Sequence, residues 1–216
     1  RCGQTEEWFA KSNETPPPKQ LGNCRRVAER PLLDGKLDEP LWHSATRLTS
    51  ASSVEPRLSG ETSSPSEVRF TYDREFLYLA IQCPKAKNVD YTTDDRPRPR
   101  DADLSAHDRV VVRLDVDRDY TTAYELAIDH RGWTHDACWN DATWNPTWFV
   151  AATADESTWT IEAAIPLAEL VTEPPDAKHV WAASLVRTIP RIGDETWSGD
   201  ATSDDSPDKF GLLIFE

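Results

Sequence analysis

The chain has few glycines, no methionine and no long apolar run. Its 216 residues include eight glycines, which leaves little room for a glycine-rich phosphate-binding loop. Neither the G-x-S-x-G sequence of hydrolase nucleophiles nor the H-E-x-x-H sequence of zinc proteases occurs. No apolar stretch approaches the length that spans a bilayer. We therefore expect neither an enzyme of these classes nor a protein inserted in a membrane.

Positive charge is also scarce. The chain has 38 Asp and Glu residues against 24 Lys and Arg, which gives a net charge of -14. A surface of this sign repels phosphate backbones and anionic lipid headgroups. We therefore expect no nucleic-acid partner and no anionic membrane partner.

The four cysteines are Cys2, Cys24, Cys83 and Cys138, and none of them forms a C-x-x-C sequence. This spacing argues against zinc ribbons, thioredoxin-type chemistry and covalent haem attachment. An even number of cysteines fits two disulfides in an oxidising compartment. We expect Cys2 to pair with Cys24, which would close the N-terminal tail. We expect Cys83 to pair with Cys138, because both of these lie at the end of an apparent strand. The other two pairings, and four free thiols, stay open.

The chain divides into a tail over residues 1–25 and one domain over residues 26–216. The tail has no clear periodicity and contains three consecutive prolines, which favour a stiff, extended linker. Since the chain begins at Arg1, without an initiator Met or a signal-type apolar segment, we expect it to be a mature or excised piece. Near the start of the domain, Asp38 and Pro40 predict a helical turn that places Trp42 in the core.

The domain is expected to be all-β. Its strand-like runs are short, rich in β-branched and aromatic residues, and separated by polar turns, while long helical patterns are absent. These runs predict strands over residues 67–73, 76–83, 109–116, 122–129, 147–153, 158–166, 180–189 and 210–216. Together they predict an antiparallel β-sandwich with two sheets, of immunoglobulin-like or jelly-roll-like type, with short helical turns. A long charged connection over residues 84–106 predicts a functional or mobile loop.

Five of the nine tryptophans lie between Trp133 and Trp159. Trp148 and Trp159 fall in strand-like runs where apolar residues alternate, so we expect them in the core. Trp139 and Trp144 lie instead in a loop-like segment with three polar neighbours, which are Asn140, Asp141 and Asn145. A loop indole beside amide and carboxylate groups suits a sugar-binding platform. The alternative is that these indoles cap the sandwich or contact a neighbouring domain.

Three other groups of residues are candidates for binding. Trp197 lies in a polar segment and is a weaker candidate for contact with a sugar. Arg187, near the end of a buried strand, either pairs with a carboxylate such as Asp108 or contacts a ligand. Three carboxylates at alternate positions after a strand suit calcium, unless they simply form a solvated acidic turn. They are Asp115, Asp117 and Asp119.

The order of motifs resembles the family 9 carbohydrate-binding modules. The resemblance is carried by LLDGKLDEPLWHSA, VRFTYDREFLYLAIQC, HDRVVVRLDVD, YELAIDHRG, WTIEAAIPLAEL, VWAASLVRTI and FGLLIFE. It implies an antiparallel β-sandwich, non-catalytic sugar binding, frequent structural calcium and attachment to a larger secreted or surface protein. It extends to similarly built DOMON-like domains, some of which bind haem through Met with His or Lys. Because this chain lacks Met, we do not expect haem.

The chain departs from the family at its sugar clamp. Sugar-binding members hold a terminal sugar between two tryptophans, and the corresponding positions here are Ser105 and about Asp204. Two polar partners of that clamp correspond to Val111 and Glu125. A sugar site of that design is therefore not expected.

Two functions follow from the sequence. The first is non-catalytic binding of a polysaccharide or glycan by an exported or cell-envelope protein, located in the extracellular space, the periplasm or at the cell surface. The second is a structural or assembly domain that has lost sugar binding and holds other subunits or domains of its parent protein.

Overall fold

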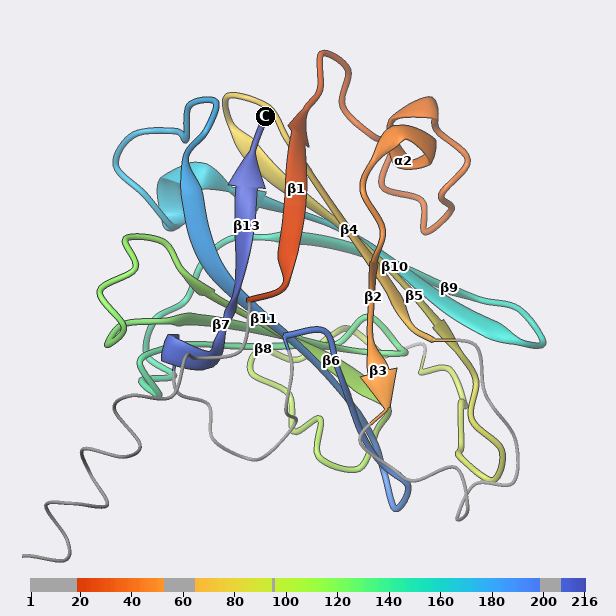
Figure 1. The fold of residues 1–216 in the computed structure, drawn as a ribbon. Helices are drawn as coiled ribbons and strands as arrows, with labels where there is room; N and C mark the ends of the chain where they lie inside the picture. Colours follow the sequence, from red (N-terminus) through yellow and green to blue (C-terminus); the bar gives the residue numbers. More distant parts are fainter. Residues whose placement is uncertain (1–18, 53–64, 95, 199–206) are drawn as a thin grey trace, which may run out of the picture.

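The computed structural model describes residues 19–52, 65–94, 96–198 and 207–216. In these ranges the chain forms thirteen strands with only short helical turns (Figure 1). The strands are β1 Leu21–Arg26, β2 Leu48–Thr49, β3 Ala51–Ser52, β4 Glu67–Tyr72, β5 Phe76–Pro84, β6 Arg109–Asp115, β7 Tyr124–Asp129, β8 Thr134–Cys138, β9 Phe149–Ala154, β10 Thr158–Pro166, β11 Val180–Ile189, β12 Gly193–Thr196 and β13 Gly211–Phe215. The helical turns are α2 Pro40–Ser44, η1 Leu167–Glu169 and η2 Pro207–Lys209.

The strands form two layers that meet at β1. The first layer runs β8-β7-β6-β11-β13-β1, and the second runs β1-β4-β5-β10-β9. In Figure 1, β1 lies between β13 and β4. The first part of β1 pairs with β13, its last two residues pair with β4, and both pairings are parallel. The predicted all-β sandwich is confirmed, and its pairing is antiparallel except at β1.

Both faces of β5 are buried, which explains its continuous apolar sequence. Leu77, Leu79 and Ile81 point into the core between the sheets, because alternate residues of a strand face opposite sides. Tyr78 on the other face packs with Trp42 from α2. The predicted burial of Trp42 is thus confirmed, as its side chain has no exposed surface.

The first strand corrects the predicted domain boundary. Residues 21–25 belong to β1 and not to a linker, and Cys24 is fully buried in the core. The sequence LGNCRR shows little alternation because β1 is positioned by backbone hydrogen bonds to two neighbouring strands. The proline run lies outside the described residues.

The predicted disulfide between Cys83 and Cys138 is wrong. Both thiols are free; Cys83 lies on β5 in the second sheet and Cys138 ends the edge strand β8 of the first. Strand ends that look alike in sequence therefore belong to different layers. Cys24 is also free, while its expected partner Cys2 lies outside the described residues.

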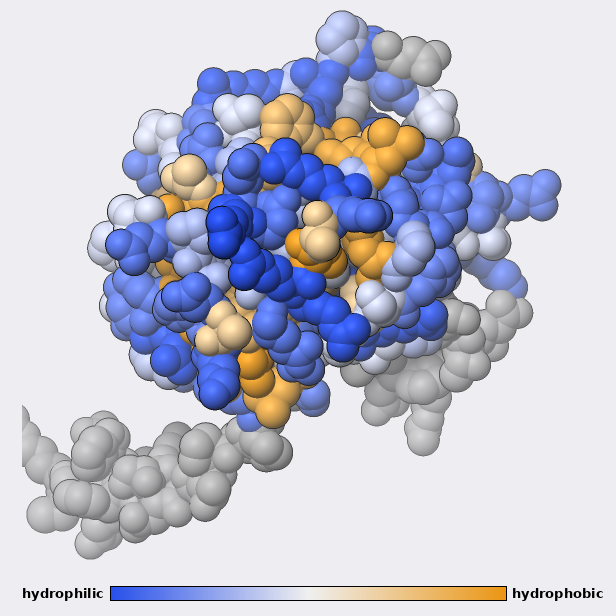
Figure 2. Space-filling model, turned by 90° about the horizontal axis from the view of Figure 1, so that it is seen from above, coloured by the Kyte–Doolittle hydropathy of each residue, from blue (hydrophilic) through white to orange (hydrophobic). Residues whose placement is uncertain are grey.

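The surface reflects the charged composition. On the face shown in Figure 2, hydrophilic residues predominate and apolar residues form separate areas. The loop over residues 84–106 contributes to the interior as well, because its Ala102 and Leu104 are buried against Val111 and Ala127 on the outer face of the first sheet. None of the helices in the described ranges has the length and apolar character that a membrane crossing requires.

Candidate functional site

Trp148 and Trp159 are core residues, as predicted. Trp159 has no exposed surface, and its indole N–H donates to Asp108 Oδ2 at 3.1 Å. Trp148 is also buried and donates its indole N–H to Asp136 Oδ2 at 3.2 Å. Each buried indole therefore has a carboxylate acceptor, which satisfies its single donor. Both rings therefore belong to the core and not to an exposed platform.

Trp139 differs from both, since 70% of it is exposed. It follows β8 in a tight turn where Trp139 and Asn140 have φ angles of 50° and 61°. Asn adopts this left-handed conformation readily, but a bulky residue such as Trp does so at a cost. Backbone hydrogen bonds in both directions between Cys138 and Asp141, at 3.1 and 2.8 Å, close the turn. A third bond, from the Trp139 N–H to the carbonyl of Ala123 at 3.0 Å, attaches it to the chain before β7.

Trp144 is only partly available. It is half-buried and packs on Tyr124 with a distance of 4.8 Å between ring centroids, at the margin of the main core. The predicted pair of loop tryptophans therefore separates into one exposed ring and one largely occupied ring.

The polar neighbours are arranged along the same loop. Asn140 and Asp141 share the turn with Trp139, and both are exposed. The Asp141 carboxylate accepts the Thr143 N–H at 2.9 Å, and these contacts with Thr143 lower the pKa of Asp141. Asn145 is exposed farther along. The turn thus presents an indole, an amide and an ionised carboxylate at the surface.

Trp197 is not a surface residue, contrary to the prediction. It is 7% exposed and lies in the main core. Gly22 and Gly211 lie so close to its ring that a Cβ on Gly211 would be 2.7 Å from Cζ3. Two glycines from opposite ends of the chain thus make room for an indole whose sequence neighbours are polar.

Arg187 is buried in an ion-pair network, so a direct ligand contact is ruled out. Its guanidinium donates to both carboxylate oxygens of Asp108, at 2.9 and 2.6 Å. Its remaining contacts are with Ser66 Oγ at 3.0 Å, the Pro84 carbonyl at 2.6 Å and Glu195 at 3.5 Å. The alternative that it pairs with Asp108 is confirmed.

The positions that correspond to the family's clamp offer little to a ligand. Ser105 is exposed but is no aromatic ring, and Asp204 lies outside the described residues. Val111 is buried, and Glu125 accepts a bond from Arg113 at 2.9 Å.

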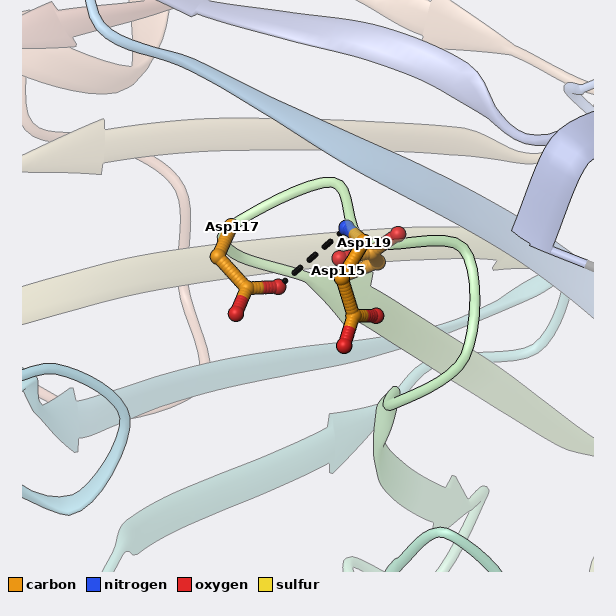
Figure 3. A group of neighbouring side chains, drawn as sticks. All are labelled: Asp115, Asp117 and Asp119. Atoms are coloured by element: carbon orange, nitrogen blue, oxygen red, sulfur yellow. Dashed lines mark hydrogen bonds between the residues drawn. The ribbon is translucent and has the colours of Figure 1, made fainter.

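The three aspartates after β6 come together, as predicted. One ligand oxygen from each of Asp115, Asp117 and Asp119 lies within 4.8 Å of the others. Figure 3 shows them around the turn, where the Asp119 N–H donates to Asp117 Oδ1 at 3.3 Å. Asp115 is fully buried; its Oδ2 accepts the Tyr120 N–H at 3.1 Å, but its Oδ1 has no hydrogen-bond partner. Burial, and then the proximity of Asp117, raise the pKa of Asp115. A bound cation would neutralise the repulsion between the three carboxylates and would coordinate the unpaired Oδ1 of Asp115.

Comparison with solved structures supports the fold. Similar structures include two carbohydrate-binding modules of family 9 from Caldicellulosiruptor kristjanssonii. The one in complex with cellotriose has a TM-score of 0.66 at 12% identity, covering 91% of this chain and 94% of that chain. The one in complex with glucose has a TM-score of 0.62 at 13% identity, covering 90% and 95%. A putative carbohydrate-binding protein from Bacteroides uniformis has a TM-score of 0.64 at 11% identity, covering 92% and 100%.

Sequence comparison gives the family. No curated protein matches the chain. The family model described as carbohydrate family 9 binding domain-like matches residues 33–213, which include β2 to β12 and the first three residues of β13. Motif order, sandwich architecture and this match agree: the chain belongs to the carbohydrate family 9 binding domain-like family and is a carbohydrate-binding module.

Proposed function

We propose that this module is non-catalytic and binds a glycan at the turn that carries Trp139, Asn140 and Asp141. The observation that carries the proposal is the 70% exposed indole of Trp139, held on a closed turn at a strained φ of 50°. An indole face packs well on the CH face of a sugar ring, and the neighbouring amide and carboxylate bond to sugar hydroxyls. The 70% exposure of Trp139 favours this function over the alternative in which both loop indoles cap the sandwich of their own domain.

The comparisons suggest which glycan to test first. The similar modules from Caldicellulosiruptor kristjanssonii were solved with cellotriose and with glucose. A β-glucan is therefore the first candidate, although the contacts must differ because the family's clamp positions are substituted here. We also propose that the protein acts in the extracellular space, the periplasm or at the cell surface, where a glycan partner of this kind is encountered.

Binding is tested by isothermal titration calorimetry with cellotriose and by retention on insoluble cellulose. The substitution Trp139→Ala should weaken the affinity for the glycan by a factor of about ten or more, which corresponds to ~1.4 kcal/mol. The matched control is Leu32→Ala, because Leu32 is also 70% exposed and apolar. If wild-type protein binds a glycan with an affinity that Trp139→Ala leaves unchanged, the site lies elsewhere. If wild-type protein binds no soluble or insoluble polysaccharide, glycan binding itself is refuted.

We also propose that calcium binds among Asp115, Asp117 and Asp119. Hard carboxylate oxygens at this spacing suit calcium, and the buried, unpartnered Oδ1 of Asp115 is the group that most needs a cation. Calcium at about 100 times its Kd would stabilise the fold by about 2.7 kcal/mol. After EDTA treatment, added calcium should therefore raise the melting temperature of wild-type protein and of Asp38→Asn, whose exposed carboxylate lies outside the cluster. It should not raise that of Asp115→Asn; equal shifts in all three proteins would contradict the site.

A further inference from the structure

A cavity of about 620 Å³ lies beside the turn between β7 and β8, in the size range of small-ligand sites. Its walls come from four separate segments: Leu33; residues 94, 96 and 98; the turn at residues 131–133; and Trp148 with the start of β9. Trp133 precedes β8 and Trp139 follows it, so the cavity and the proposed glycan turn are at opposite ends of this strand, about 20 Å apart.

Positive charge concentrates in this cavity despite the acidity of the chain. Arg96, Arg98 and Arg131 line it, and among the described lining residues Asp94 is the one acid. Two of these guanidiniums are held in place by Trp133: the one of Arg131 lies 3.9 Å from the ring centroid and the one of Arg96 lies 5.5 Å from it. Such cation–π contacts orient the guanidiniums and limit their mobility.

Two of the arginines already have carboxylate partners. Arg131, with a side chain only 7% exposed, pairs with Asp129 at 2.6 Å. Arg96 pairs with Asp94 at 2.6 Å, and its hydrogen bonds lower the pKa of Asp94 to about 2. Asp94 therefore stays ionised at neutral pH and is occupied by Arg96, which leaves the cavity with a net positive lining.

Arg98 is the available cation of the cavity. Its only hydrogen bond within the described ranges is a long one, from Nη1 to the Gly132 carbonyl at 3.4 Å, and it forms no ion pair there. The planar fork of a guanidinium matches a carboxylate, which it binds through two parallel N–H bonds. An anionic group of a ligand is thus the partner that Arg98 lacks.

The opposite side of the cavity is apolar. Phe149, half exposed, begins β9, and Val150 and Ala152 farther along the strand are half-buried. Phe149 also contacts Phe76 at 6.3 Å between ring centroids, in an edge arrangement that supports the ring. A sugar ring packs on such a surface through its CH groups while a substituent points to the arginines.

We propose that this cavity is a second binding site, which takes an acidic sugar residue such as a uronate, with its carboxylate on Arg98 and its ring on Phe149. The inference rests on the proposed function only in treating the ligand as a glycan. It assigns to the module a preference for charged glycans that its turn with Trp139 does not provide.

The test is calorimetric titration of the full chain with oligoglucuronate, with cello-oligosaccharide of the same length, and with acetate. Oligoglucuronate should bind, more weakly as NaCl rises because salt screens the ion pairs. Arg98→Gln should reduce its affinity at least tenfold. Arg74→Gln removes the same charge at another exposed arginine outside this cavity and should leave the affinity unchanged.

Four outcomes would overturn the proposal: no binding of oligoglucuronate, equal losses in Arg98→Gln and Arg74→Gln, equal affinity for the neutral oligosaccharide at this site, or acetate binding as tightly as oligoglucuronate. The last would mean that the cavity binds a free carboxylate and not a sugar. Failure of the proposed glycan turn is a separate result. In that case the wild-type protein does not bind cellotriose, but it still binds oligoglucuronate, and Arg98→Gln weakens this binding.

Discussion

Replacing Arg187 by methionine should strongly destabilise the module. Arg187 has only 1% of its side chain exposed, and Asp108 opposite has none. Its guanidinium also bonds Ser66 and the Pro84 carbonyl, and lies 3.5 Å from Glu195. Methionine retains the apolar stem but leaves these acceptors without their cation. Breaking one side of a buried pair costs about 3 to 5 kcal/mol, out of a total stability of about 5 to 15 kcal/mol.

The assays are urea unfolding, which gives the free energy of unfolding, and thermal unfolding, both monitored by tryptophan fluorescence. At about 2 to 4 °C per kcal/mol for a domain of this size, the melting temperature should fall by roughly 6 to 20 °C. Arg30→Met is the control, because Arg30 also pairs with two carboxylates, Asp73 and Glu75, but its side chain is 53% exposed. It should change the melting temperature little, since exposed ion pairs contribute little to stability.

A double variant checks the cause of the loss. Adding Asp108→Asn to Arg187→Met removes the uncompensated charge, and the amide oxygen can still accept bonds from Trp159 and Tyr91, which contact Asp108 at 3.1 and 2.6 Å. The double variant should therefore lose less stability than the sum of the two single variants. A loss below about 1 kcal/mol for Arg187→Met, or strictly additive losses, would refute this account of the buried pair.

Three further predictions concern the core and the aspartate cluster. Burial raises the pKa of Asp115, so the stability that this group contributes is greatest below the ordinary value of 3.8 and is lost as pH rises through the raised pKa of the folded state. In EDTA, Asp115→Asn should therefore gain stability relative to wild type as pH rises above that ordinary value; a difference in urea unfolding that does not change with pH would contradict this. Gly211→Ala should lower the melting temperature, because its Cβ would lie 2.7 Å from Trp197; an unchanged calorimetric scan would show that the ring moves easily. Cys24 and Cys83 are free and buried, so iodoacetamide without reductant should not label them in the native protein and should label both after denaturation. Mass spectrometry detects the labels; a disulfide would block labelling in both states.

The strands that the sequence predicts well are those with one face in the core. β5, β6, β10 and β11 show alternating or continuous apolar residues, and each forms close to its predicted position. β1 was missed because its position depends on backbone pairing with strands that are distant in sequence. For β8 only the strand end at Cys138 was expected and its bounds were not predicted, because its five residues, THDAC, are mostly polar.

The candidate site was predicted less well, for reasons that lie in tertiary contacts. Polar neighbours suggested a loop for both Trp139 and Trp197, but only the first ring is exposed, because glycines distant in sequence enclose the second. The arginine cavity could not be found from spacing, since its four segments are far apart along the chain. The one signal that pointed toward it was the unusual length of the loop over residues 84–106.

The position of β1 between the two sheets has a consequence for how the chain folds during synthesis. Leu21 pairs with Leu212, and the Glu216 N–H donates to the Cys24 carbonyl at 2.9 Å. Of the described strands, β1 is synthesised before all the others and β13 after them. The edges of β1 and β11 that pair with β13 therefore stay unpaired until the end of this domain has been made. Slow completion of such distant contacts exposes nascent strand edges to aggregation. A recombinant fragment that starts at the family match, residue 33, lacks β1 and would leave the edges of β4 and β13 that β1 covers permanently unpaired.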